Sequence, residues 1–167
     1  FETIRPALEN LEGVQRRMEI KADVRGIKII DDYGHHPTEI KTTLEAVRTS
    51  WPERRLVVVF QPHRYTRTRA LFDAFARSFY QSDALLVMPV YSAGEAPIEG
   101  VDHNLLCEAI SAHGHKRARA APGLEEAVEM LEKMLEPGDI VLTLGAGNVW
   151  QAGEALAARL QAGKEKD

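Results

Sequence analysis

Short apolar runs alternate with amphipathic stretches along most of this chain. Four runs are almost wholly apolar, which is typical of strands buried on both faces of a parallel sheet. They occupy residues 27–30, 56–60, 84–90 and 139–144. Weaker alternation predicts an edge strand over residues 16–23 and a short strand over residues 117–120.

The amphipathic stretches predict the helices that separate these strands. They cover residues 2–11, 37–50, 104–112, 124–135 and 149–161. One further helix begins near residue 65 and carries four large apolar residues on a single face: Leu71, Phe72, Phe75 and Phe79. Because strand and helix alternate without an internal repeat, the pattern predicts an α/β fold, a mostly parallel sheet with helices on both faces and right-handed connections.

Composition places the chain among ordinary globular domains and gives no indication of a nucleic-acid partner or a membrane span. Its 167 residues, 44% hydrophobic and 28% charged, are enough for one domain with a substantial core. A net charge of −4 gives no reason to expect nucleic acid, and no apolar run approaches the ~20 residues that span a bilayer. With Cys107 as its single cysteine we expect no internal disulfide and a cytoplasmic protein. The start at Phe1, without a methionine, indicates a piece of a longer protein.

Titratable groups gather in the stretch I-I-D-D-Y-G-H-H-P-T-E, residues 29–39, where a predicted strand meets a predicted helix. Proline suits the first turn of a helix, and Glu39 suits the third helical position, near the positive helix end. We therefore expect residues 31–36 to form a loop at the carboxyl edge of the sheet, where open α/β sheets bind ligands. A solvated turn with incidental histidines is the alternative.

A second polar junction, Q-P-H-R-Y-T-R-T-R at residues 61–69, should open onto the same edge. Arg64, Arg67 and Arg69 fall in the first turn of the predicted helix, where the macrodipole is positive and cations are slightly disfavoured. Arginines are expected there if an anion lies between them and the free backbone N–H groups. Long arginines that only extend into solvent are the alternative.

Five side chains near these junctions are of metal-ligating type: Asp31, Asp32, His35, His36 and His63. Adjacent histidines should diverge, and no H-x-H or H-E-x-x-H spacing occurs, so we expect no dedicated transition-metal site. A Ser-His-Asp hydrolase is disfavoured because Ser92 lies in S-A-G-E rather than in G-x-S-x-G. The other three histidines are expected at the surface: His103, His113 and His115.

The G-A-G at residues 145–147 follows a predicted strand and precedes a helix. A phosphate-binding turn has this placement, but so has a turn whose glycines only permit close packing. The sequence contains neither the dinucleotide motif G-x-G-x-x-G nor the Walker motif G-x-x-x-x-G-K-[ST]. The chain therefore lacks a triphosphate-binding loop of its own.

Four motifs together resemble the C-terminal domain of the Mur ligase family: D-D-Y-G-H-H-P-T-E, Q-P-H-R-Y-T-R-T-R, V-Y-S-A-G-E-A-P-I and L-T-L-G-A-G-N. The resemblance spans almost the whole chain in the family's order. The G-V-Q-R-R-M-E at residues 13–19 is similar to the family's junction between its central and C-terminal domains, although Met18 stands where an aromatic is common. Tyr33 and Gly34 resemble the branch that adds L-alanine, whereas the branch that recycles a tripeptide has phenylalanine and alanine there.

The resemblance implies a Rossmann-like lid domain of an ATP-dependent amide ligase of peptidoglycan synthesis. Residues 1–13 would be a helix at the junction with an absent central ATPase domain, and residues 14–167 the C-terminal domain. The implied reaction activates the carboxylate of UDP-N-acetylmuramate as an acyl phosphate, which the amine of L-alanine attacks. An N-terminal domain would bind the UDP-sugar. Mg²⁺ would be held mainly by phosphates and the central domain.

The resemblance also implies roles for two groups of residues. Arg64 and Arg67 would meet carboxylate or phosphate groups of the substrates, and His35 would lie near the reacting phosphate. His36 and His63 match the motifs but receive no role.

Three further residues would contact ATP. Asp32 would accept hydrogen bonds from the ribose, Tyr33 would lie against the nucleotide, and Arg17 would reach ATP from the hinge.

Three functional hypotheses remain open from the sequence. The first is the ligase lid domain, which would be inactive as an isolated fragment. The second is a Rossmann-like regulatory module that binds a nucleotide or anion through Arg64, Arg67 and Gly145. The third is a metal hydrolase built on the histidine and aspartate cluster.

Overall fold

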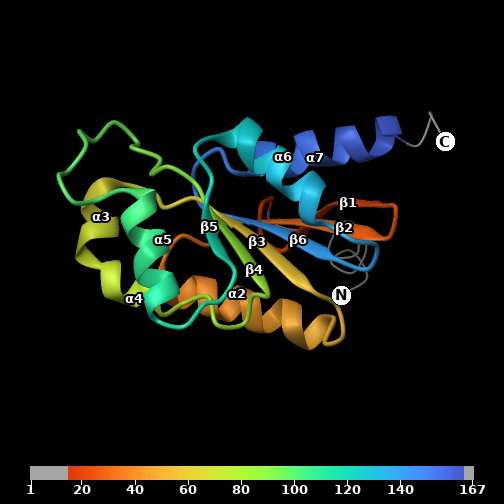
Figure 1. Cartoon of the computed structure of the whole chain (residues 1–167), viewed down its shortest axis with the longest axis horizontal. Coiled ribbons are helices and arrows are strands. Elements are labelled where there is room, and N and C mark those ends of the chain that lie inside the picture. Colours follow the sequence, from red (N-terminus) through yellow and green to blue (C-terminus); the bar gives the residue numbers. More distant parts are fainter. Residues whose placement is uncertain (1–14, 164–167) are drawn as a thin grey trace, which may run out of the picture.

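A single mixed sheet organises the computed structural model, which describes residues 15–163 (Figure 1). The strand order is β1-β2-β6-β3-β4-β5. The strands are β1 (Glu19–Val24), β2 (Ile27–Asp32), β3 (Leu56–Phe60), β4 (Ala84–Val87), β5 (Ala118–Ala120) and β6 (Ile140–Leu144). The helices are α2 (Pro37–Ser50), α3 (Tyr65–Ala70), α4 (Phe72–Ala76), α5 (His103–Ala112), α6 (Leu124–Met134) and α7 (Trp150–Ala162).

The predicted α/β architecture is confirmed. Strands β2, β6, β3, β4 and β5 run parallel to their neighbours, whereas β1 pairs antiparallel with β2 at one edge. Helices α2 and α5 lie on one face of the sheet and α6 and α7 on the other (Figure 1). The helix predicted over residues 2–11 and the C-terminal tail lie outside the described residues.

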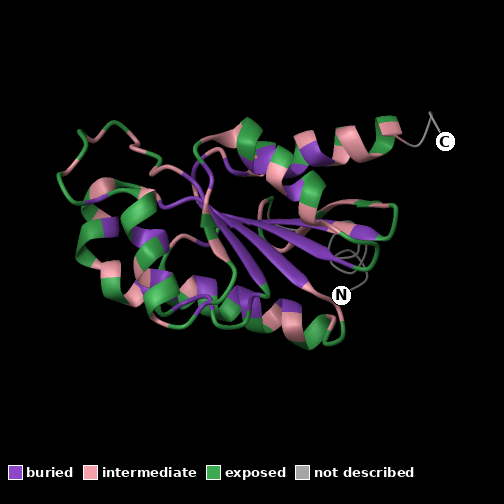
Figure 2. Ribbon diagram, viewed as in Figure 1, coloured by how far each residue is buried: buried purple, intermediate pink, exposed green. Residues whose placement is uncertain are grey.

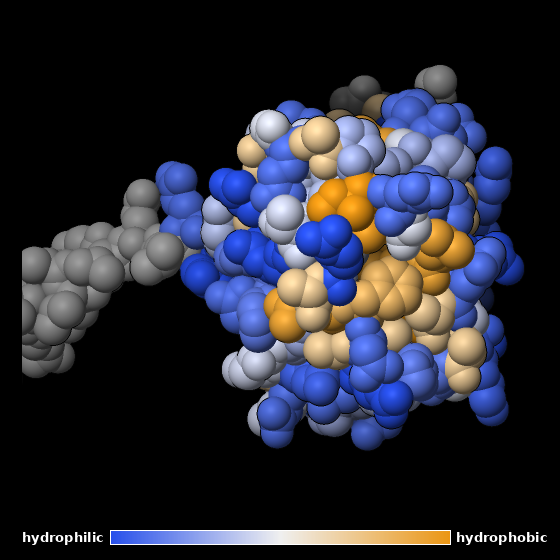
Figure 3. Space-filling model, turned by 90° about the vertical axis from the view of Figure 1, so that its left-hand side faces the viewer, coloured by the Kyte–Doolittle hydropathy of each residue, from blue (hydrophilic) through white to orange (hydrophobic). Residues whose placement is uncertain are grey.

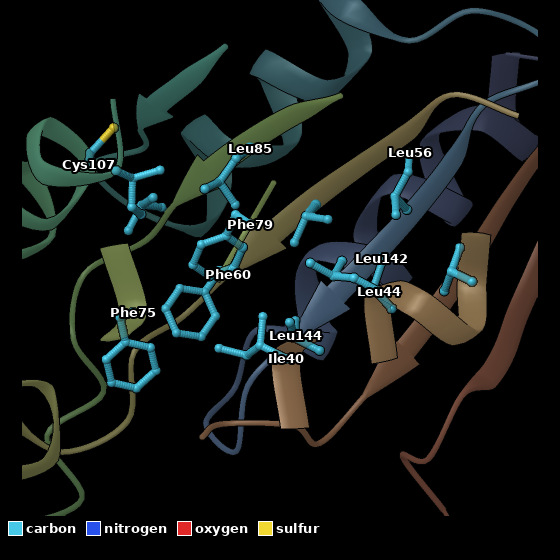
Figure 4. Close-up of a cluster of buried hydrophobic side chains, with 14 of the residues drawn as sticks. Ile40, Leu44, Leu56, Phe60, Phe75, Phe79, Leu85, Cys107, Leu142 and Leu144 are labelled. Atoms are coloured by element: carbon cyan, nitrogen blue, oxygen red, sulfur yellow. The ribbon is translucent and has the colours of Figure 1, made fainter. Parts of the chain in front are cut away.

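Burial of the sheet on both faces explains the continuous apolar runs (Figure 2). In β3, Val58 and Phe60 point into the core beneath α2, α4 and α5, while Val57 and Val59 pack against α6 and α7. Every residue of β3 is buried, so no position on this strand was available for a polar side chain. Phe60 also contacts the rings of Phe75 and Phe79, with centroids 5.6 and 5.0 Å apart (Figure 4).

The segment after β3 differs from its prediction. Instead of one helix it forms α3 and α4, which are separated at Leu71, where φ is −117° and ψ is 21°. Phe79 lies beyond the end of α4. Phe75 and Phe79 are nevertheless both buried, as the predicted apolar face requires.

Three strand boundaries differ from the prediction by more than one residue. β2 continues through the two aspartates, since Asp31 pairs with Thr143 and Asp32 with Leu144 in the ladder, so the loop begins at residue 33 rather than 31. β4 stops at Val87 rather than at residue 90, and β1 starts at Glu19 rather than at residue 16. Arg16 has a φ of 57°, which a strand residue does not adopt.

Apolar side chains are partly exposed on one face of the molecule. The face in Figure 3 gathers apolar surface at its middle, and Leu105 on α5 is 39% exposed. Cys107 is buried in α5 as expected. None of the helices formed by residues 15–163 is both long and apolar enough to cross a membrane.

His115 is buried rather than at the surface, which corrects the expectation from the sequence. Its Nδ1 accepts a hydrogen bond from the backbone N–H of Arg117, and its Nε2 lies 2.9 Å from Oγ of Ser82. Ser82 in turn donates to the carbonyl of Phe79. This network needs a neutral ring that is protonated on Nε2, and burial lowers the pKa of His115 below 6.5.

We therefore expect the chain to lose stability as the pH falls below 6.5, the ordinary histidine pKa. Below that value the unfolded state binds a proton that the buried ring of His115 resists, so folding becomes less favourable. Above that pH the ring is neutral in both the folded and the unfolded chain, so His115 no longer lowers the stability. Urea unfolding between pH 8 and 5 should show this decline, and it should be shallower in His115→Gln. His103→Gln is the control, and an undiminished slope in His115→Gln would contradict the assignment.

Candidate functional site at the carboxyl edge of the sheet

The sequence motifs meet where β2, β6 and β3 end side by side. Asp32 and Phe60 both pair with Leu144, the last residue of β6, so the segments that follow these three strands start at the same edge. The loop after β4 joins them through a parallel bridge between His63 and Tyr91. The prediction that the two polar junctions open onto one edge is thus confirmed.

Arg16, which lies before β1, joins the end of β2 to the turn after β6. Its Nε lies 2.8 Å from Oδ2 of Asp31, its Nη2 donates to the carbonyl of Gly145 at 2.7 Å, and its Nη1 donates to that of Gly147 at 3.1 Å. Asp31 is fully buried and accepts a second hydrogen bond from Thr143. Reasoning from the sequence missed Arg16, although two aspartates in sequence next to a buried strand indicate the need for a nearby cation.

Its neighbour Arg17, the residue that the sequence singled out, faces outward. The Arg17 side chain is 47% exposed, and its closest acidic group is Glu39, 3.7 Å away. Its guanidinium carbon lies 5.7 Å from the centre of the Tyr33 ring, and Tyr33 is 37% exposed. Arg17 and Tyr33 thus form an accessible cation and aromatic face.

Asp32 lies inside the domain, with 3% of its surface exposed. Its Oδ1 accepts from the N–H of Gly34 at 2.8 Å and from Thr43 at 3.1 Å, and its Oδ2 accepts from the N–H of Met18 at 3.0 Å. A Cβ on residue 34 would lie 2.8 Å from Oδ1 of Asp32, which explains the glycine. A carboxylate accepts about four hydrogen bonds, so groups of the domain itself fill three of the positions on Asp32.

Four rings form a row across the edge. Tyr33 meets His35 edge-on at 5.4 Å, His35 lies 5.8 Å from His63, and His63 stacks on Tyr91 at 5.4 Å with an interplanar angle of 10°. The row connects the segments after β2 and β3 with the loop after β4. It gives this edge a partly apolar, partly titratable lining.

The two adjacent histidines diverge, as predicted. His36 is the N-cap of α2, and its Nδ1 accepts from the N–H of Thr38 at 3.4 Å, while Glu39 at N3 accepts from the N–H of His36. His35 instead turns toward the row of rings, with its Nδ1 3.0 Å from the carbonyl oxygen of Tyr33. Because a carbonyl only accepts, Nδ1 of His35 carries the proton, and Nε2 is the ring nitrogen left to accept one.

The arginines after β3 do not all lie in the first turn of a long helix, which corrects the prediction. Helix α3 has six residues, so Arg67 and Arg69 belong to its last turn, where cations are favoured. Arg64 is the N-cap residue and has a φ of 72°. The anion expected at this helix start is present as a carboxylate of the same chain, since Glu95 accepts from the N–H and hydroxyl of Thr66 and lies 3.3 Å from Nη1 of Arg64.

Arg67 has no acidic partner among the described residues. Its Nη1 lies 3.3 Å from both Nδ1 and the carbonyl oxygen of His63. Since a guanidinium only donates, His63 accepts through Nδ1 and carries its proton on Nε2. Burial, followed by the charge of Arg67, lowers the pKa of His63, which keeps the ring neutral at pH 7. Arg67 thus carries an uncompensated positive charge at the site.

The G-A-G turn serves close packing. A Cβ on Gly147 would lie 2.3 Å from Oε1 of Gln61 and 2.7 Å from the ring of Tyr91, and one on Gly145 would lie 2.6 Å from the Gln61 carbonyl. The carbonyls of both glycines also accept from Arg16. The turn therefore holds the segments of the site together, which is the packing role that the sequence allowed for its glycines.

The described residues bring no three His, Cys, Asp or Glu side chains together in an arrangement that could hold a metal ion. Hydrogen bonds from within the domain fill most acceptor positions of the Asp31 and Asp32 carboxylates.

Comparison with known proteins connects this geometry to a family. The family model described as the Mur ligase, glutamate ligase domain, matches residues 16–147. The chain belongs to the Mur ligase family. The match contains each of the segments that build the site, from Arg16 to Gly147.

Relatives of this Mur ligase domain include two proteins named UDP-N-acetylmuramate--L-alanine ligase. The protein of Desulforapulum autotrophicum is 58% identical over 93% of this chain and 34% of its own length. That of Desulfosudis oleivorans is 59% identical over 92% of this chain and again 34% of its own length. The chain thus spans about a third of the length of the curated relatives it matches.

Solved structures show the same Mur ligase domain fold. The UDP-N-acetylmuramate-alanine ligase MurC of Thermotoga maritima has a TM-score of 0.73 and 28% identity, over 95% of this chain and 33% of that one. A murein peptide ligase of Psychrobacter arcticus also reaches a TM-score of 0.73, with 24% identity over 93% of this chain and 32% of that one, and so shows the fold alone.

The two adjacent arginines of the Mur ligase domain should differ sharply in their effect on stability. Arg16→Ala leaves the buried carboxylate of Asp31 without its cation and should lower the free energy of unfolding by about 3 kcal/mol. Arg17→Ala removes an exposed pair and should change it by about 0.5 kcal/mol or less. Chemical denaturation of both variants measures the difference, and equal losses would contradict the role given to Arg16.

Proposed function

We propose that this domain is the C-terminal lid of an ATP-dependent ligase that joins L-alanine to UDP-N-acetylmuramate in peptidoglycan synthesis. The named relatives, 50–59% identical to this chain, support the alanine-adding activity. The reaction would form an acyl phosphate on the muramyl carboxylate, and the alanine amine would then displace phosphate. ATP and a UDP-sugar as substrates would place this reaction in the cytoplasm.

The observation that carries the proposal is the uncompensated cation of Arg67 beside a neutral His63 and a partly exposed His35 ring, whose Nδ1 is engaged by the Tyr33 carbonyl. An incoming amino acid brings a carboxylate and an amine. Arg67, joined by Arg64, would bind the carboxylate, because a guanidinium recognises it through two parallel hydrogen bonds. His35 would lie near the reacting phosphate, with Nε2 free to accept a hydrogen bond from the amine.

The nucleotide would occupy the exposed side of the same edge. Tyr33 offers a partly exposed ring face, and Arg17 offers an exposed guanidinium next to it. Asp32 would use its one remaining acceptor position for a ribose hydroxyl. Mg²⁺ would be bound mainly by phosphate oxygens and by another domain, since this preference for phosphate is usual for the ion.

The remaining parts of the ligase would come from other domains of the same protein. Residues 14–167 would form the lid, and residues 1–13 a helix at its junction with a central ATPase domain. A further domain would bind the UDP-sugar. The lid would then bring Arg67 and His35 onto substrates held elsewhere, which is how closing domains complete many active sites.

The direct test is ATP-dependent ligation by the full-length protein that contains this domain. Incubation with UDP-N-acetylmuramate, ATP and either L-alanine or a muropeptide tripeptide should give product only with L-alanine. Product formation with the tripeptide instead would assign the domain to the recycling branch. ATP binding without either ligation would favour the regulatory module.

The 167-residue chain alone should neither hydrolyse ATP nor ligate alanine. It lacks a Walker motif, and catalysis of phosphoryl transfer consists mostly of positioning and charge stabilisation around the phosphates. Phosphate release and product formation by the purified chain are the measurements. Turnover that co-purifies with the chain and survives removal of contaminating ATPases would contradict the domain assignment.

In the full-length ligase, Arg67→Ala should cost about 2–4 kcal/mol of transition-state stabilisation. The free energy of unfolding should scarcely change, since among the described residues the Arg67 side chain hydrogen-bonds only to His63. Arg67→Lys should restore part of the activity, because lysine keeps the charge but loses the planar donor pair. Arg69→Ala, an exposed arginine of the same helix, is the control. Steady-state kinetics and thermal melts decide, and normal turnover by Arg67→Ala would end the carboxylate-binding role.

A further inference from the structure

The loop between β4 and α5 is fastened to the segment that carries the site arginines. The N–H of Tyr91 donates to the carbonyl of Pro62 at 2.8 Å, and the N–H of Arg64 donates to the carbonyl of Tyr91 at 2.8 Å. Stacking of His63 on Tyr91 adds a side-chain contact at the same place. The loop is therefore fixed at its start, and Glu95, four residues on, meets the start of α3.

One carboxylate of this loop connects the backbone of α3 with a site arginine. Oε2 of Glu95 accepts from the N–H of Thr66 at 3.0 Å, and Oε1 accepts from the Thr66 hydroxyl at 2.8 Å. Oε1 also lies 3.3 Å from Nη1 of Arg64. Hydrogen bonds from Thr66, and then from Arg64, lower the pKa of Glu95, so the carboxylate is ionised at neutral pH.

The side chain of Arg64 does not cap α3. As N-cap of α3 it makes no side-chain capping bond, and its φ of 72° is uncommon for a residue with a side chain. The first N–H groups of a helix need acceptors, and Glu95 provides one from a distant part of the chain. The same contact fixes one end of the Arg64 guanidinium.

We propose that Glu95 is a positioning residue that orients Arg64 for the carboxylate of the incoming amino acid. It holds Arg64 by Nη1 alone, and the Arg64 side chain is 46% exposed, so Nε and Nη2 remain to donate to a ligand. An arginine that is held at one end loses less conformational freedom on binding, which favours affinity. This inference rests on the proposed amino-acid ligation.

The alternative is that Glu95 competes with the substrate carboxylate for Arg64, and it predicts the opposite change in the KM for the amino acid. If Glu95 occupied the place of the substrate carboxylate, its removal would free Arg64 and lower the KM for the amino acid. If Glu95 orients Arg64, its removal raises that KM. The side chain of Glu95 is 20% exposed and bonded to the backbone of α3, which favours a fixed partner over a displaceable one.

The test uses the full-length ligase with Glu95→Gln and Glu95→Ala. Glutamine keeps an acceptor for Thr66 and removes the charge, so α3 keeps its cap while Arg64 loses its ion pair. We expect Glu95→Gln to raise the KM for L-alanine about fivefold and Glu95→Ala about tenfold or more, with kcat changed less than about threefold. The KM values for ATP and UDP-N-acetylmuramate should not move.

Two further variants separate positioning from general disturbance. Glu99→Gln changes an exposed acid of the same loop and should leave all constants unchanged. In an Arg64→Gln background, Glu95→Gln should add less than about a twofold change, because its effect passes through Arg64.

Three outcomes would overturn the inference: a lowered KM for L-alanine, an unchanged one, or an undiminished effect in the Arg64→Gln background. Alanine ligation by the unsubstituted enzyme is measured before the variants. If it is absent, the proposed function is overturned, and the role of Glu95 with it.

Discussion

Two carboxylates are buried in succession at the end of β2, and both have to find donors inside the domain. A buried carboxylate without a partner costs several kcal/mol, so the neighbouring segments are constrained to supply one. Asp31 obtains a cation from Arg16 and a hydroxyl from Thr143, whereas Asp32 obtains two backbone N–H groups and the hydroxyl of Thr43. These contacts fix the segment before β1, the turn at Gly34, helix α2 and, through Arg16, the G-A-G turn.

The arginines at the carboxyl edge of the sheet divide into those with an acidic partner in the described part of the chain and one without. Arg16 is neutralised by Asp31, and Arg64 by Glu95. Arg67 has only the neutral His63 as a partner among residues 15–163, so its charge is the one most available to an anionic ligand. In the proposed function this charge would bind a carboxylate or phosphate, while the surrounding ion pairs would keep the neighbouring side chains in place.

Sequence periodicity predicted the sheet well and the connections less well. The apolar runs of β3 and β6 are buried on both faces, and this constraint is local enough to read from the residues themselves. The break at Leu71 could not be read in this way, because Phe75 and Phe79 suit either one helix or two. His115 was misplaced for a related reason, since its partner Ser82 is distant in sequence.

The sequence by itself determined the alternation of strands and helices along the chain, the presence of two polar junctions, and through four motifs the family. It did so because apolar periodicity and short motifs depend on neighbouring residues. Only the tertiary structure decided which of the arginines at the site lack an acidic partner among the described residues. Arg16 and Arg17 are adjacent and chemically identical, yet one is tied to Asp31 and the other is exposed. Arg64 and Arg67 differ in the same way, because Glu95 pairs with Arg64 and not with Arg67. Glu95 lies about thirty residues further along the chain, and it meets α3 only because β3 and β4 are paired in parallel.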